Sequence, residues 1–384
     1  MKHSTRMSLG IGATVTAAAL LLSGCSSSGT PSESSSGDGE ELTPITLQLQ
    51  WLAQAQFAGY YAAVAEGYYE EEGLDVTIQE AGTDTVPIDV LAAGDADFAI
   101  SWVPKVLGSI EQGTNVTDVA QIFERSGTTQ ISFVDQDITT AADLEGKTVG
   151  SWGYGNEWEL FAGMQKAGID TATGITLVQQ AFDMNGFLAG DIDAAQAMTY
   201  NEYAQVLETV NPETGELYQP DDLNVINWND EGTAMLQDAI WADATRLAED
   251  EDYADITVKF IKASIKGWVF ARDNPEEVAQ IVTDAGSTLG TSHQLWMANE
   301  VNKLIWPSTN GIGMIDAAAW DQTVGIAMET QNDTGSTIIT TDPPDTAYSN
   351  DYVEQALAEL KEEGVDVDGA DFAPLTVELQ EGGN

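Results

Sequence analysis

Aromatic and amide side chains follow the first predicted strand of this chain in close succession. Trp51 comes directly after the alternating segment 45–49, and Gln54 and Gln56 lie just beyond it. An indole can stack on a flat ring, which contributes about 1–3 kcal/mol per nucleobase, and a side-chain amide both donates and accepts hydrogen bonds. These residues could therefore bind a planar heterocycle. The alternative role is packing at the lip of the core for Trp51 and helix capping for the two glutamines.

Residues of similar kinds recur after the later predicted strands. In an open parallel sheet, ligands bind beyond the carboxyl ends of the strands, so these positions are candidate contacts. The further candidates are Tyr60, Asp84, Trp102, Gly153, Asn156, Glu157, Tyr200, Asn201 and Glu202. Core packing is the stronger alternative for Tyr60, and a plain turn is the alternative for Asp84. Helix capping is the alternative for Asn156, Asn201 and Glu202.

The loop 151–158 carries glycines and a carboxylate between a predicted strand and a predicted helix. Gly153 would let backbone N–H groups approach a ligand closely. Glu157 could accept a hydrogen bond from an aminopyrimidine or a ring N–H, or the positive end of the helix could be what holds it there. The loop lacks the Gly-Lys-Ser/Thr ending of a nucleotide phosphate loop, so that function is not predicted.

The sequence offers little for acid–base, nucleophilic or metal-dependent catalysis. Its two histidines are His3 and His293, and Cys25 is the sole cysteine. Neither an HExxH zinc pattern nor a Gly-x-Ser-x-Gly elbow occurs. Carboxylates alone could support glycoside chemistry, but the order of the strands does not point to it. We therefore predict a protein that is not an enzyme, with no cofactor, no metal site and no disulfide.

The charge of the chain is strongly acidic. Asp and Glu total 63 against 13 Lys and Arg, for a formal net charge of −50. Such a surface repels nucleic acid, which needs cationic side chains to neutralise its phosphates. Nucleic-acid binding is therefore excluded. Hydrophobic residues make up 43% of the chain, so we expect a folded body with carboxylates on its outer helix faces, adapted to a saline or alkaline exterior.

The N-terminus resembles a bacterial lipoprotein signal. Residues 1–6 are basic, residues 9–22 are uncharged and mostly apolar, and small residues precede Cys25. We expect residues 1–24 to be the signal peptide, and residues 25–42 to be the lipidated Cys25 with a flexible Ser/Gly/acidic tether. A diacylglycerol on Cys25 would hold the protein at the extracytoplasmic face of the cell membrane. No later segment has the roughly 18 consecutive apolar residues of a spanning helix.

Strands and helices alternate along the rest of the chain. The first predicted strands are 45–49, 74–78 and 97–100, a second series lies at 147–150, 175–178 and 193–198, and long helices cover 256–272 and 275–285. This alternation predicts an α/β fold with parallel-type sheets flanked by helices. We expect residues 43–137 plus 238–384 to form lobe 1 and residues 138–237 to form lobe 2, with a ligand cleft between them.

An ordered series of short motifs resembles a known family. The motifs occupy residues 51–63, 66–69, 72–76, 93–98, 143–150, 155–157 and 229–236. Together they are similar to periplasmic-binding proteins of the NMT1/THI5-like group, over about residues 43–300. The resemblance implies a two-lobed type II binding-protein fold, no catalysis, and delivery of a small-molecule ligand to an ABC permease in the cytoplasmic membrane. We expect the protein to be a monomer.

The start of the body and the segment 198–203 resemble receptors for aromatic N-heterocycles, so a thiamine pyrimidine precursor or riboflavin is the expected ligand. An oxyanion such as an aliphatic sulfonate or nitrate is the alternative ligand. It would need a cation in the cleft, and Lys105 and Arg125 lie near the candidate loops. A thiamine pyrimidine synthase is a weaker alternative, because the cysteine-rich motif of the fungal enzymes is missing. An adhesive surface protein is a third class, which would show no affinity for small ligands.

Overall fold

The computed structural model describes residues 42–384. The predicted signal peptide, the predicted lipidation site Cys25 and all of the predicted tether before residue 42 lie outside these residues. In the described part of the chain, no helix combines the length and apolarity needed to cross a bilayer.

The first sheet has five strands in the order β2-β1-β3-β10-β4. Its strands are β1 (Thr43–Gln48), β2 (Leu74–Gln79), β3 (Phe98–Trp102), β4 (Val116–Gln121) and β10 (Asp238–Asp243). β1 runs parallel to β2 and β3, whereas β10 is antiparallel to β3 and β4. Every residue of β3 is buried, as expected for a central strand with helices on both faces.

The second sheet repeats this strand order. Its strands are β5 (Thr128–Phe133), β6 (Thr148–Ser151), β7 (Thr176–Gln179), β8 (Ala195–Met198) and β9 (Leu223–Asn227). β5 is antiparallel to β8 and β9, β6 is parallel to β7, and a parallel bridge between Val149 and Ala194 joins the two parts. The order is therefore β7-β6-β8-β5-β9, with β5 in the place that β10 takes in the first sheet.

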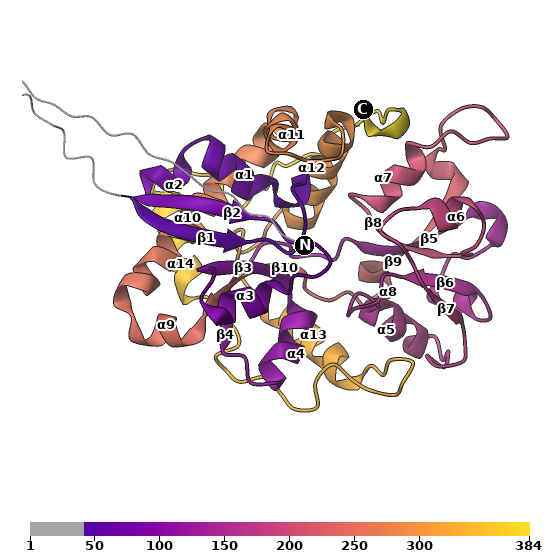
Figure 1. Ribbon diagram of the computed structural model, residues 1–384, viewed down its shortest axis with the longest axis horizontal. Coiled ribbons are helices and arrows are strands. Elements are labelled where there is room, and N and C mark those ends of the chain that lie inside the picture. Colours follow the sequence, from indigo (N-terminus) through magenta and orange to yellow (C-terminus); the bar gives the residue numbers. More distant parts are fainter. Residues whose placement is uncertain (1–41) are drawn as a thin grey trace, which may run out of the picture. The chain divides into compact units, whose positions relative to one another are not determined.

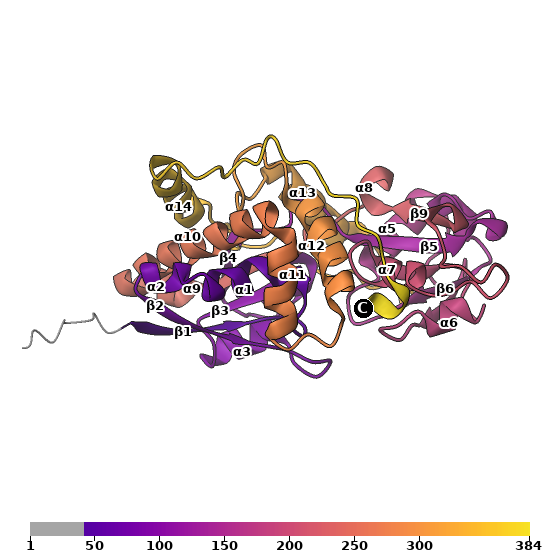
Figure 2. The same cartoon turned by 90° about the horizontal axis from the view of Figure 1, so that it is seen from above.

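Helices cover both faces of the first sheet, and we call this assembly the first lobe. One face packs on α1 (Ala58–Ala65), α2 (Tyr68–Glu71), α10 (Glu251–Asp273), α11 (Pro275–Asp284), α12 (Thr291–Ile305) and α14 (Asp351–Glu362). The other face packs on α3 (Pro87–Ala93), α4 (Val103–Glu111) and α13 (Ala317–Glu329). α9 (Ala244–Glu249) follows β10. Figure 1 shows α3 and α4 on the side of β3 opposite α1, and Figure 2 shows α3 on the side opposite α1 and α10.

The second lobe is the second sheet with its own helices. α5 (Trp158–Lys166) and α8 (Trp228–Glu231) pack on one face, and α6 (Asn185–Leu188) and α7 (Glu202–Leu207) pack on the other. Short 3-10 turns lie at Ala55–Phe57, Val134–Gln136, Ala141–Leu144, Pro220–Asp222 and Glu381–Gly383. Because β5 pairs only with β8 and β9, residues 128–133 belong with the second sheet, upstream of the crossing expected near residue 138. β10, a strand of the first sheet, begins at Asp238.

Two glycines allow α1 to lie close against α10. A Cβ atom on Gly267 would lie 2.0 Å from the carbonyl oxygen of Gly59. A Cβ atom on Gly59 would lie 2.2 Å from the ring of Trp268. Neither position can hold a side chain without moving the helices apart. This close contact fixes α1 behind the loop that carries Trp51, Gln54 and Gln56.

Candidate ligand-binding site

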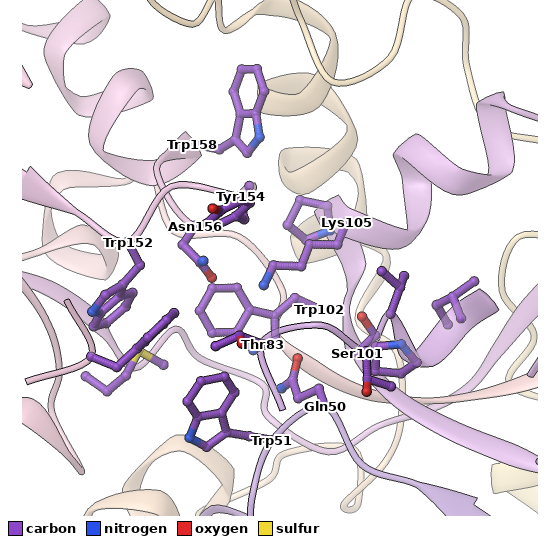
Figure 3. A pocket seen from close by; sticks show the side chains of 18 of the residues that line it. Gln50, Trp51, Thr83, Ser101, Trp102, Lys105, Trp152, Tyr154, Asn156 and Trp158 are labelled. Atoms are coloured by element: carbon purple, nitrogen blue, oxygen red, sulfur yellow. The ribbon is translucent and has the colours of Figure 1, made fainter. Parts of the chain in front are cut away.

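The loops at the carboxyl ends of the strands of both lobes enclose a cavity of about 870 Å³. A volume of this size is typical of small-molecule sites. The first lobe contributes residues that follow β1, β2 and β3, and the second lobe contributes residues that follow β6, β7 and β8. Side chains that line it include Gln50, Trp51, Gln54, Gln56, Thr83, Asp84, Ser101, Trp102, Lys105, Trp152, Tyr154, Asn156, Trp158, Phe182, Tyr200, Asn201 and Glu202. Figure 3 shows ten of the lining residues labelled.

Aromatic rings from both lobes meet in the cavity. Trp51 of the first lobe contacts Phe182 of the second lobe, with ring centroids 4.8 Å apart. Trp152 stacks on the same Phe182 at 6.2 Å and an interplanar angle of 14°. Phe182, which is 42% exposed, therefore lies between two indoles. Trp102 and Tyr200 also line the cavity, so aromatic rings form a substantial part of its walls.

Asp238 anchors the polar floor of the first lobe. Its Oδ1 accepts hydrogen bonds from Gln50 Nε2 at 2.6 Å and from Trp102 Nε1 at 2.7 Å. Its Oδ2 accepts from Gln56 Nε2 at 2.8 Å, and Gln56 Oε1 accepts from Gln54 Nε2 at 2.7 Å. One buried carboxylate thus holds four cavity-lining side chains in place, directly or through Gln56. Burial raises the pKa of Asp238 to about 6.

Lys105 is the cation of the cavity lining. It lies on the first turn of α4, and its Nζ is 4.7 Å from the centroid of the Trp102 ring. Burial lowers its pKa to about 8, against the opposing effect of Asp238 and Glu157. Arg125, the other cation near the candidate loops, donates instead to the carbonyl oxygens of Leu304 and Pro307. It does not line the cavity.

Asn201 and Glu202 are held by a network that joins the two lobes. Glu202 Oε2 accepts from Met198 N at 3.0 Å, and Glu202 Oε1 accepts from Asn201 Nδ2 at 2.9 Å. Asn201 Oδ1 lies 3.0 Å from Nε2 of His293 on α12, and His293 Nδ1 lies 2.9 Å from Glu208 Oε2. Both ring nitrogens of His293 lie within hydrogen-bond distance of side-chain oxygens, one on Asn201 and one on Glu208. Burial raises the pKa of Glu202 to about 7.

The glycine-rich loop 151–158 is closed by its own polar groups. Gly153, Tyr154 and Gly155 all have positive φ values, of 70°, 55° and 85°. Asn156 Nδ2 donates to the carbonyl of Gly153 at 2.6 Å, and Glu157 Oε2 accepts from Gly155 N at 3.0 Å. A tyrosine with positive φ is uncommon, and here its side chain is 80% exposed at the cavity wall.

Nine of the twelve predicted contacts line the cavity, and three do not. Trp51, Gln54, Gln56, Asp84, Trp102, Asn156, Tyr200, Asn201 and Glu202 lie in its wall. Tyr60 is buried in the first lobe, edge-on to Trp268 at 5.6 Å, as its packing alternative implied. Gly153 and Glu157 are outside the lining, and Glu157 Oε2 accepts a hydrogen bond from Gly155 N in the same loop. The three are therefore not cavity contacts in this structure.

Several residues of the site were not among the sequence candidates. Trp152, Tyr154 and Trp158 belong to the loop in which Gly153 and Asn156 were singled out, so their aromatic character was a usable signal. Asp238 precedes the apolar residues 239–242. A carboxylate at the start of such an apolar segment indicates a buried side chain that needs hydrogen-bond partners. Phe182 and Gln50 carried no clear signal.

The comparisons with known proteins agree with this architecture. The family model described as NMT1/THI5 like matches residues 54–278. The chain is 28% identical over 248 residues to the formylaminopyrimidine-binding protein of Halalkalibacterium halodurans, which covers 64% of this chain and 71% of that protein. It is 26% identical over 306 residues to the riboflavin-binding protein RibY of Chloroflexus aurantiacus, covering 73% and 79%.

A solved structure supports the fold alone. The periplasmic aliphatic sulphonate binding protein SsuA from Escherichia coli superposes with a TM-score of 0.54 at 14% identity, covering 88% of this chain and 94% of that one. The expected two-lobed type II α/β fold is thereby confirmed. The family model spans more than half of the chain, and the chain belongs to the NMT1/THI5-like family.

Proposed function

We propose that this protein is the extracytoplasmic substrate-binding subunit of an ABC importer, and that it captures a small aromatic N-heterocycle. A thiamine pyrimidine precursor or riboflavin is the ligand class. The observation that carries the proposal is the set of aromatic rings that both lobes place in one cavity. Trp51 and Trp102 come from the first lobe, and Trp152, Phe182 and Tyr200 come from the second. Two relatives named for a formylaminopyrimidine and for riboflavin support this ligand class.

The polar groups of the cavity suit the edge of such a ring. Gln54 uses its Nε2 to donate to Gln56, and within residues 42–384 its Oε1 has no hydrogen-bond partner. Gln54 can therefore accept from a ring amino or N–H group. Asn201 and Glu202 supply amide and carboxyl groups from the other lobe. A ligand that contacts both lobes favours the closed form, because it binds that form better than the open one.

The remaining parts of the proposal concern where the protein acts. Lipid attached to Cys25 holds the receptor at the outer face of the cell membrane, where it reaches a permease as a monomer. The protein binds its ligand and does not transform it. In support of this last point, the cavity lining in the described residues contains neither histidine nor cysteine. In the same residues, no group of three or more His, Cys, Asp or Glu side chains is arranged to hold a metal ion.

An oxyanion receptor is the second candidate, and one observation favours it. Lys105 lies in the cavity wall, and a sulfonate or nitrate would need such a cation. The aromatic rings around it have no role for a small oxyanion, so this candidate ranks below the heterocycle receptor.

A thermal-shift screen tests the proposal. A ligand at 100 times its Kd stabilises the native state by about 2.7 kcal/mol, which corresponds to a rise of about 4 °C in Tm for a domain of about 340 residues. The screen includes thiamine pyrimidines, riboflavin, nucleobases, nitrate and alkanesulfonates. We expect the shift with a pyrimidine or with riboflavin. A shift with nitrate or sulfonate alone would replace the proposal by the oxyanion receptor.

A further inference from the structure

Lys105 is unusual among the cations of this acidic protein. Residues 42–384 contain eleven Lys and Arg side chains. Seven of them form ion pairs with carboxylates: Arg246, Lys259, Lys262, Lys266, Arg272, Lys303 and Lys361. Three others donate to backbone carbonyls: Arg125, Lys147 and Lys166. Within the described residues, Lys105 is the one whose charged group has neither kind of partner.

The carboxylates near Lys105 accept hydrogen bonds from other groups. Both oxygens of Asp238 accept hydrogen bonds, from Gln50, Trp102 and Gln56. Glu157 accepts from the backbone of Gly155. Neither carboxylate reaches the ammonium group within ion-pairing distance, although both act on it through space. In a chain with 63 acidic residues against 13 basic ones, this arrangement keeps one positive charge available in the cavity.

The surroundings of the ammonium group are aromatic. Its Nζ lies 4.7 Å from the centroid of the Trp102 ring, and Figure 3 shows the amine beside that ring in the cavity. Trp102 is itself fixed by its hydrogen bond to Asp238. The cation and the ring face are therefore presented together, so one ligand can meet both. The negative face of the indole stabilises the ammonium group while no ligand is bound.

We propose that Lys105 selects a heterocycle that bears a negatively charged substituent, such as a phosphate or a carboxylate. This inference rests on the proposed heterocycle-binding function and specifies the ligand within it. The ring of the ligand stacks on the aromatic walls, and its anionic group forms a charge-assisted hydrogen bond with Lys105 Nζ. The neutral form of the same heterocycle leaves the ammonium group unpaired and binds more weakly.

Two matched ligand pairs test the inference by isothermal titration calorimetry on the purified protein. The pairs are riboflavin with riboflavin 5′-phosphate, and 4-amino-5-hydroxymethyl-2-methylpyrimidine with its phosphate. For the pair whose ring binds, we expect the phosphorylated member to bind about 10- to 100-fold more tightly, the range of one charge-assisted hydrogen bond. Lys105→Met should remove this advantage, so that the affinity for the phosphorylated member falls by about 10- to 100-fold more than the affinity for the neutral member.

Two variants control for charge and folding. Lys361→Met removes the same charge from the exposed end of α14 and should leave the preference unchanged, and Lys105→Arg should retain most of it. Equal affinity for both members of a pair, or an equal loss for both in Lys105→Met, would overturn the inference while the heterocycle function stands. If neither ring binds the native protein, the proposed function itself is wrong.

Discussion

Replacing Asp238 by asparagine should change the hydrogen-bonding group that Gln54 presents to the ligand, from an acceptor to a donor. The carboxylate accepts from three side-chain donors, of which Gln56 Nε2 is alone on Oδ2. Asparagine places an N–H₂ group at one of these positions. If that group faces Gln56, two N–H₂ donors point at each other, and the Gln56 amide must rotate by about 180° to present its oxygen instead. Gln56 Nε2 then faces Gln54, so the Gln54 amide must turn as well. Gln54 thereby loses its acceptor toward the ligand and presents a donor in its place.

The effect on folding should be small, because two terms oppose each other. Burial raises the pKa of Asp238 from 3.8 to about 6, so at pH 8 the buried charge is disfavoured by about 3 kcal/mol. Asparagine removes this penalty. A buried donor left unpaired costs about 1–3 kcal/mol. The free energy of unfolding should therefore change by less than about 2 kcal/mol, whereas ligand affinity should fall by about 10- to 100-fold.

Calorimetric titration with the ligand found in the screen, together with urea unfolding of the same samples, measures both quantities. Asp118→Asn is the matched control. Asp118 is a buried carboxylate on β4 that accepts one backbone hydrogen bond, from Ala120 N, and it does not line the cavity. We expect it to leave affinity unchanged. Native affinity in Asp238→Asn, or the same loss in Asp118→Asn, would refute the anchoring role of Asp238.

Further predictions concern the walls, the helix contact and the buried acids. Trp51→Ala should weaken ligand binding by about 10- to 100-fold in titrations, from one lost stacking contact, whereas Leu52→Ala, next to it but outside the lining, should not. Gly267→Ala should lower the free energy of unfolding by about 1–3 kcal/mol in urea, because its Cβ would meet Gly59 O at 2.0 Å. Gly325→Ala, with open space around it, should be neutral or stabilising. Burial raises the pKa of Glu159 and of Glu202 from 4.5 to about 7. The stability these acids contribute is therefore complete below pH 4.5 and is lost as the pH rises through 7, on the order of 3 kcal/mol each. Unfolding curves at pH 5 and pH 8 should differ accordingly, and a flatter pH dependence is expected in Glu159→Gln; an unchanged one would contradict the assignment.

Much of the architecture could be predicted because it depends on local patterns. Proline favours the start of a helix and glycine its end, and α3 begins at Pro87 and is capped by Gly94 at φ 77°. The alternation of strands and helices also predicted which loops lie at the carboxyl ends of strands. Trp51, Trp102 and Asn201 were chosen on that ground, and the structure places all three in the cavity wall. Their contacts with a ligand remain predictions.

The antiparallel strands β5 and β10 were harder to foresee. Pairing direction depends on which segment of the chain returns to a sheet, and nothing in the short sequence Thr128–Phe133 specifies β8 and β9 as its neighbours. Glu157 illustrates the same difficulty for a side chain. Its position at a helix start was correctly identified, but its carboxylate accepts a hydrogen bond from the backbone N–H of Gly155.

The sequence by itself determined the order of strands and helices, the loops that carry aromatic and amide residues, and the family. Each of these depends on short stretches of neighbouring residues. Only the tertiary structure decided which polar groups form hydrogen bonds with one another. Asp238 accepts a hydrogen bond from Trp102, which lies 136 positions away along the chain, and the same packing places Lys105 nearby with no carboxylate within ion-pairing distance. Hydrogen bonds and ion pairs form only between groups that are close in space. The unpaired ammonium group of Lys105 can therefore be identified only when distant segments of the chain are packed together.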